Sequence, residues 1–137
     1  MDLRAVSRRV GIAAAVVTVV ALVAPYALIS GAEYADQLAA YYASGVVGWG
    51  GIALFSLLAA VVIASVERGN VEPGTLAGVA VVLGLATTAS AATWALAVEP
   101  SAVFRDHLWL VWHAPAVVAL TVPVPLAAGV YARELLT

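Results

Sequence analysis

Four long apolar stretches, separated by short polar segments, dominate the pattern of the chain. They cover residues 10–32, 37–66, 73–98 and 107–132, and none contains Asp, Glu, Lys or Arg. Each is at least as long as the roughly 20 residues that a helix needs to cross the ~30 Å hydrocarbon core of a bilayer. Barrel strands would alternate apolar and polar positions, which these stretches do not. The pattern predicts four membrane-crossing helices, over approximately residues 10–30, 44–66, 74–98 and 108–132.

Short connections make neighbouring helices in the sequence neighbours in space. The predicted fold is an all-α membrane protein, a single transmembrane domain over residues 1–137 that forms an antiparallel four-helix bundle with up-down-up-down topology. The second stretch is longer than one crossing needs, so residues 37–44 are expected at the interface or as an outward extension. Asp36 and Asp106 precede the second and fourth spans, where we expect them to cap the helix starts.

Composition narrows the class of protein further. Hydrophobic residues make up 64% of the 137 positions and charged residues 10%, and the mean hydropathy is +1.05. Soluble domains average about 45–50% apolar and about 25% charged residues, so this chain has too little charge to cover its apolar mass in water. The absence of cysteine excludes disulfides and thiolate metal sites. The net charge of −2 excludes nucleic acid as a partner.

The cations predict the orientation of the chain in the membrane. Four crossings place both termini and the loop between the second and third spans on one side. That side carries Arg4, Arg8, Arg9, Arg68 and Arg133, and the other side carries Arg105. The positive-inside rule therefore predicts a multi-pass protein of the cell membrane with both termini cytoplasmic. Aromatic residues gather at the opposite edge, as an aromatic belt does: Tyr34, Tyr41, Tyr42, Phe104, Trp109 and Trp112.

The chain contains no lysine, has more acidic than basic residues and is rich in Ala and Val. Together with four spans, this composition resembles small four-span membrane proteins of haloarchaeal type, a resemblance that implies no activity. Small four-span multidrug exporters are similar in size and topology. Their first helix carries a membrane-embedded glutamate, however, and residues 10–32 contain none.

His113 is the one ionisable side chain inside a predicted span. Pro115 weakens the helix beside it and is expected to leave a carbonyl near the imidazole. One interpretation is contact with a quinone, a haem or a metal. The other, which we favour, is a neutral histidine bonded to a backbone group or water. Haem ligation by two histidines needs a partner such as His107, but that residue lies at the membrane edge and about 240° around the helix from His113.

Polar residues of the two loops on the non-cytoplasmic side form a second candidate site. Carboxylates and an imidazole suit a divalent cation, but they show no metal-binding spacing. The candidates are Glu33, Asp36, Glu99, Asp106 and His107. We favour ordinary wetting of the loop ends and expect no bound metal.

Small residues give the second and third spans faces on which helices can approach closely. The packing candidates are Gly45, Gly48, Gly74, Gly78 and Gly84. Hydroxyls of the third span, from Thr87, Thr88, Ser90 and Thr93, either hydrogen-bond across helices or line a polar path for a solute. We favour packing, because transmembrane bundles routinely use such faces.

Three functions are compatible with this sequence. The leading hypothesis is a non-enzymatic accessory or scaffold subunit without a cofactor, which contacts itself or another membrane subunit through its helices. The first alternative is a small oligomeric permease for a neutral solute. The second is a quinone- or haem-contacting subunit of a membrane redox chain.

Overall fold

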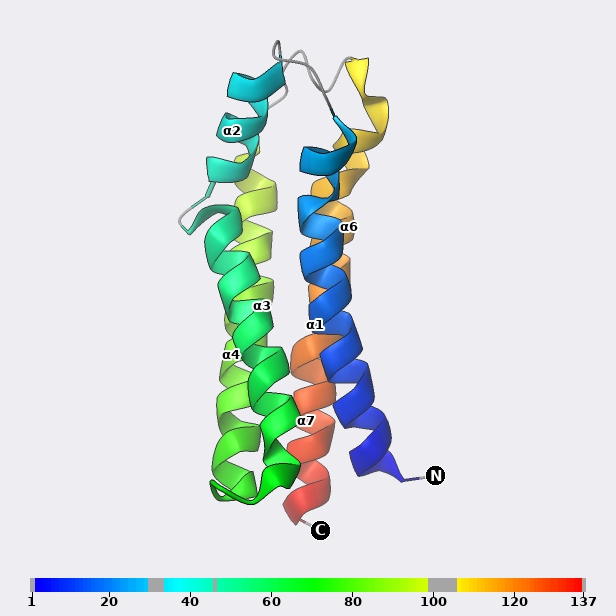
Figure 1. Ribbon diagram of the computed structural model, residues 1–137, viewed down its shortest axis with the longest axis vertical. Coiled ribbons are helices and arrows are strands. Elements are labelled where there is room, and N and C mark those ends of the chain that lie inside the picture. The colour runs from blue at the N-terminus through cyan, green and yellow to red at the C-terminus, as the bar shows by residue number, and fades with distance from the viewer. Residues whose placement is uncertain (1, 30–33, 46, 99–105, 137) are drawn as a thin grey trace.

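The computed structural model describes residues 2–29, 34–45, 47–98 and 106–136. These residues form helices in the order α1 (Leu3–Leu28), α2 (Ala35–Ala43), α3 (Gly48–Ser65), η2 (Val66–Arg68), α4 (Pro73–Ala97), η3 (Leu108–Trp112), α6 (His113–Thr121) and α7 (Pro123–Leu136), shown in Figure 1. Four segments are long and apolar enough to cross a membrane: Leu3–Leu28, Gly48–Arg68, Pro73–Ala97 and Leu108–Leu136. The predicted all-α bundle is confirmed, and four of its segments have the length and apolar composition of membrane spans.

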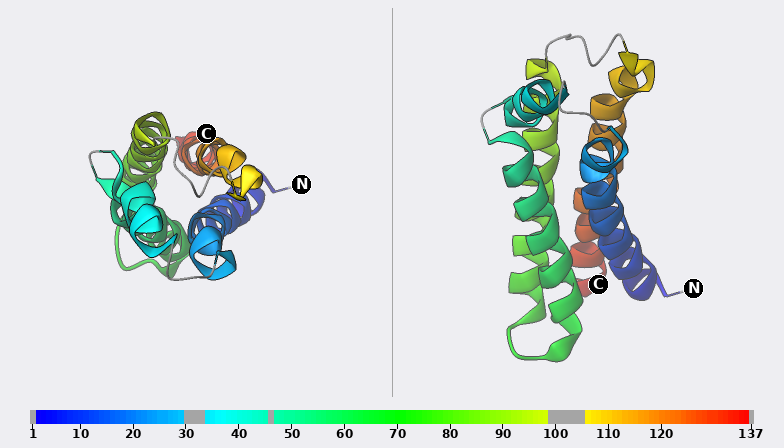
Figure 2. Two further views of the ribbon diagram at one scale, coloured as in Figure 1. Left: turned by 90° about the horizontal axis from the view of Figure 1, so that it is seen from above. Right: turned by 45° about the horizontal axis from the view of Figure 1, so that its top comes forward.

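The spans form a ring in which neighbours in sequence are neighbours in space. α1 packs against α3 and against the α6–α7 segment, and α4 packs against the same two neighbours. The view from above in Figure 2 shows this ring. Both termini lie at the end of the bundle where η2 turns into α4, and α2 and η3 lie at the opposite end (Figure 1). We call these the terminal end and the α2 end.

The second span begins at Gly48, because a turn separates it from α2. Gly45 and Gly48 have φ angles of +83° and +63°, which L side chains rarely adopt. A Cβ on Gly45 would lie 2.9 Å from the Cα of Trp94, so glycine also allows the turn to approach α4. Residues 35–43 thus form a separate short helix at the end of the bundle.

Helix caps differ from those expected. The N-cap residue of α2 is Tyr34, which makes no capping hydrogen bond, and Asp36 lies in the first turn. Asp106 accepts a hydrogen bond from the Tyr34 hydroxyl at 2.7 Å and does not cap η3, whose N-cap is His107. Asp36 and Asp106 are therefore not N-cap residues, because each lies one or two positions away from the N-cap, but Asp36 in the first turn of α2 lies where a carboxylate favours the positive end of the helix dipole.

Carboxylate caps occur instead at the terminal end. The Asp2 carboxylate accepts from the backbone N–H of Arg4, at the start of α1. Glu72 accepts from the backbone N–H groups of Gly74 and Thr75, at 2.8 and 2.7 Å. Pro73 follows as the first residue of α4, a position that needs no N–H donor.

Apolar side chains fill the bundle from one end to the other. Larger residues, including Leu22, Ile52, Trp94, Leu110 and Val117, are buried towards the α2 end. Ala15, Ala59 and Val124 form a tighter layer, which lets the helices come close. Val66, Ala77 and Tyr131 close the terminal end. Because lipid is as apolar as these side chains, close packing and interhelical hydrogen bonds hold the bundle together.

Candidate functional site

A proline in α1 creates the most unusual polar site in the described structure. Pro25 has no N–H, so the carbonyl of Ala21, four residues earlier, lacks its normal helical donor. The imidazole Nε2 of His113, on α6, lies 2.6 Å from this oxygen. A carbonyl oxygen only accepts, so Nε2 must carry a proton and donate it. His113 thus replaces the hydrogen bond that Pro25 removes from α1.

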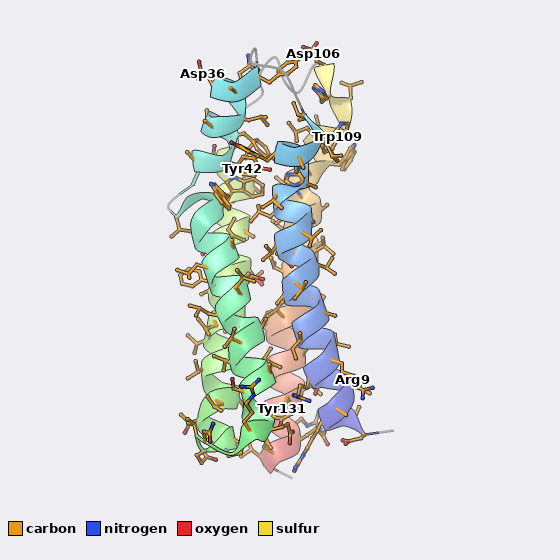
Figure 3. All side chains as sticks on the ribbon, in the orientation of Figure 1. Arg9, Asp36, Tyr42, Asp106, Trp109 and Tyr131 are labelled. Atoms are coloured by element: carbon orange, nitrogen blue, oxygen red, sulfur yellow. The ribbon has the colours of Figure 1, made fainter. Side chains whose placement is uncertain are left out.

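A tyrosine of α2 makes a second repair in the same turn. The Tyr42 hydroxyl donates to the carbonyl of Leu22 at 2.8 Å and accepts from the backbone N–H of Tyr26 at 3.2 Å. These two backbone groups are four residues apart and would pair directly in a regular helix. The Tyr42 hydroxyl therefore bridges these two backbone groups in the turn that contains Pro25. Figure 3 places Tyr42 at the α2 end, between α2 and α1.

The second nitrogen of His113 is also engaged. The Tyr41 hydroxyl lies 2.5 Å from Nδ1. Because Nε2 carries the proton, Nδ1 of the neutral ring accepts from this hydroxyl. Trp94 contacts His113 edge-on, and its indole N–H donates to the Tyr41 carbonyl at 2.9 Å. We call Tyr41, Tyr42, Trp94 and His113 the His113 cluster.

Burial raises the pKa of the two tyrosines of this cluster further above physiological pH. Desolvation raises the pKa of Tyr42 to about 12, against the lowering effect of the hydrogen bond from Tyr26. Desolvation and the neighbouring Tyr42 also raise the pKa of Tyr41. Both side chains therefore stay neutral hydrogen-bond donors at physiological pH.

The geometry limits what His113 can bind. Its ring is buried, and both nitrogens have partners within the protein. Ligation of a haem or metal would break one of these bonds and leave a buried polar group unpaired, which costs about 1–3 kcal/mol. The imidazole is thus placed to hold α1, α2 and α6 together.

A lateral groove adjoins the His113 cluster. Its volume is about 680 Å³, and its walls include Tyr26 and Ala27 of α1, Ala39, Tyr42 and Ala43 of α2, and Trp49 of α3. The lining is almost entirely apolar. Ligand sites typically occupy about 300–1,000 Å³ with such linings. The groove is therefore large enough for a small apolar guest.

The candidate metal residues are only partly described. Glu33 and Glu99 lie outside the described residues. Asp106 and His107 both contact Tyr34. Asp106 accepts the hydrogen bond from the Tyr34 hydroxyl, and the His107 ring meets the Tyr34 ring edge-on with 5.1 Å between the ring centroids. Figure 3 shows Asp36 on α2 and Asp106 on the other side of this end. Among the described residues, no three His, Asp or Glu side chains lie close enough together to hold a metal ion.

The hydroxyls of α4 point in different directions. Thr87 is fully buried and donates to the carbonyl four residues before it. Ser90 is half-buried, whereas Thr93 is exposed and donates to the Ser90 carbonyl. Thr88 is half-buried and lies on a third direction around the helix. The four candidates for a polar path therefore do not share one face.

Thr88 instead takes part in a second proline repair. Pro125 cannot donate to the carbonyl of Thr121, four residues earlier. The Thr88 hydroxyl lies 3.4 Å from that oxygen and 3.2 Å from the Gly84 carbonyl. A Cβ on Gly84 would lie 2.8 Å from the Cα of Pro125, so α4 and α7 touch backbone to backbone here. Gly84 is a packing glycine in this structure.

The other two glycines predicted to pack on the third span lie on its exposed side. A Cβ on Gly78 would meet no atom within 4 Å, and one on Gly74 would meet only the Glu72 carboxylate. They make no close approach to another helix within the described chain.

Sequence reasoning anticipated a histidine bonded to a proline-freed carbonyl but assigned the wrong proline. The carbonyl belongs to Ala21 and is freed by Pro25, whereas Pro115 lies on the histidine's own helix. Sequence reasoning also missed Tyr41 and Tyr42, which it treated as belt residues. A proline within an apolar span was the available signal, because its freed carbonyl needs a donor from elsewhere.

The fold and the apolar helices define a multi-pass integral membrane protein built as a helical bundle. The chain belongs to a family of unknown function, DUF7548, whose model matches residues 1–136. No match was found among curated proteins or among solved structures.

Proposed function

We propose that this chain is a non-enzymatic accessory subunit, which works through helix contacts with another membrane subunit or a second copy of itself. Both termini face the cytoplasm in this proposal, following the arginines of the terminal end. The haloarchaeal type suggested by the composition is part of the same proposal.

One observation carries the proposal: the polar groups of the His113 cluster form hydrogen bonds within the bundle. Nε2 and Nδ1 of His113, the Tyr42 hydroxyl and the Trp94 indole each bond to another group of the bundle. Catalysis or redox chemistry needs such groups to be available to a substrate. A network that locks three helices together favours a rigid scaffold.

The permease alternative has less support. Alternating access requires helices to move against each other, whereas bonds from Tyr42 and His113 connect neighbouring helices. Thr87 and Thr88 also donate to carbonyls of their own helix. These hydroxyls would have to give up such bonds to serve a solute.

Photo-cross-linking in native membranes tests the proposal. Amine-reactive reagents are unsuitable because the chain has no lysine. A photoreactive amino acid is placed at the exposed positions Leu57 and Val61 of α3 and Val82 and Leu85 of α4, with the buried Ile52 as the control. We expect a discrete protein adduct from at least one exposed position and none from Ile52. A protein that gives no protein adduct and runs as a lone monomer in mild detergent would contradict the proposal.

A further inference from the structure

The lateral groove lies at the depth of the bilayer where hydrocarbon meets headgroups. A helix rises 1.5 Å per residue, so about 20 residues counted from Val10, just after Arg9, reach Ile29. Tyr26 and Ala27 therefore lie in the last turn inside the hydrocarbon. Trp49, at the start of α3, lies at the corresponding edge of the second span.

The position and the lining of this groove indicate what fills it. It opens between α1, α2 and α3 on the surface of the bundle, and its lining is nearly free of polar surface. Water inside this groove would meet few hydrogen-bond partners, because the polar groups lie at its rim, and an empty apolar space forfeits dispersion contacts. Lipid chains are the molecules present around a membrane-embedded surface at this level.

Two side chains at the rim provide hydrogen-bond donors. Tyr26 and Trp49 are 71% and 43% exposed. Within the described part of the chain, neither the Tyr26 hydroxyl nor the Trp49 indole N–H has a hydrogen-bond partner. Both groups suit ester or phosphate oxygens of a lipid, because aromatic rings of this kind sit at the headgroup level.

The groove is also preformed. Its inner wall is Tyr42, whose hydroxyl is fixed between the Leu22 carbonyl and the Tyr26 N–H. The small side chains of Ala39 and Ala43 leave room on the α2 side. A preformed site loses less conformational entropy on binding than a flexible one.

We propose that the lateral groove is a binding site for one hydrocarbon chain of a membrane lipid, with the lipid's polar end held by Tyr26 and Trp49. This inference goes beyond the proposed scaffold function and does not depend on it.

A photoactivatable lipid tests this site in the intact protein. The protein is reconstituted in bilayers doped with a phosphatidylglycerol that carries a diazirine in one acyl chain, and the labelled residues are mapped by mass spectrometry. Ala39→Phe places a ring in the groove, and Ala40→Phe is the matched control on the next, exposed position of α2. Helicity and unfolding midpoint verify that both variants fold.

We expect the label to concentrate on the groove residues, to fall about tenfold in Ala39→Phe, and to stay unchanged in Ala40→Phe. Equal labelling of the two folded variants would overturn the proposal. The proposal would also be overturned if the lipid labelled the groove residues no more strongly than the residues around Val82 on α4. A photoreactive amino acid at Ala43 that captures a protein instead of a lipid in native membranes would assign the groove to a protein partner and also overturn it.

Discussion

Replacing His113 by Phe should destabilise the bundle through the carbonyl that Pro25 leaves unpaired. The substitution removes the donor to Ala21 and the acceptor for Tyr41 while keeping a ring in the site. An unpaired buried polar group costs about 1–3 kcal/mol. Interhelical hydrogen bonds in membranes average about 0.6 and reach about 1.7 kcal/mol. We therefore expect His113→Phe to lower the free energy of unfolding by about 1–3 kcal/mol.

The same reasoning predicts a coupling between His113 and Pro25. Pro25→Ala restores an N–H that can bond to the Ala21 carbonyl, so the oxygen no longer depends on the imidazole. His113→Phe should then cost less in the Pro25→Ala background, by about 1 kcal/mol. The matched control is Ser56→Ala, which removes another hydrogen bond to α1, donated to the Ala15 carbonyl at 2.9 Å. The effects of Ser56→Ala and Pro25→Ala on the free energy of unfolding should be additive.

Reversible unfolding by SDS in mixed micelles, followed by tryptophan fluorescence, measures these free energies. The four proteins of each double-mutant cycle are compared under one set of conditions. Additive effects of His113→Phe and Pro25→Ala, to within about 0.3–0.5 kcal/mol, would refute the repair of α1 by His113. Coupling of Ser56→Ala to Pro25→Ala would show that the proline acts through the whole helix instead.

Three further predictions concern other contacts of the fold. Gly84→Ala should cost about 1–3 kcal/mol in the same assay, because its Cβ meets the Pro125 backbone, whereas Gly78→Ala points into open space and should leave stability unchanged or slightly higher. Hydrogen bonds from two backbone N–H groups hold the pKa of Glu72 below its usual range. Its stabilising contribution is complete above the unfolded-state pKa and is lost as pH falls through the lower folded-state pKa, so Glu72→Gln should weaken the acid dependence of unfolding. Tyr42→Phe should speed hydrogen exchange of the Tyr26 backbone amide, because the hydroxyl that accepts from this N–H is lost. Unchanged exchange of the Tyr26 amide would contradict the bridging role of Tyr42.

The sequence was sufficient to predict the spans and their packing as a bundle. Long apolar stretches without charges have few physical solutions in lipid, because every backbone group must be paired within a helix or a barrel. Residues 37–44 were set apart from the second span, at the interface or as an extension of the helix, but the glycines that make the break between α2 and α3 were not identified. Gly45 and Gly48 lie within the second apolar stretch and resemble packing glycines, and only the backbone reveals their positive φ angles.

The candidate site was harder to predict because it joins residues from three helices. His113 was identified from its position in a span, but its partners depend on which helix faces α6 and at what height. The same limit applies to glycines: Gly78 and Gly84 look alike in the sequence, and only Gly84 faces another backbone. Periodicity alone does not give the rotation of one helix against its neighbour.

A chain that folds across a lipid bilayer has α2 on one side of the membrane and the turn before α4 on the other. Because the natural chain has no cysteine, single cysteines report this directly. Asp36→Cys, Asn70→Cys and Leu85→Cys are treated with a membrane-impermeant maleimide in sealed vesicles. We expect Asp36→Cys and Asn70→Cys to react from opposite faces of the membrane and Leu85→Cys to stay unlabelled. Labelling of Leu85→Cys, or of the other two from the same face, would contradict it.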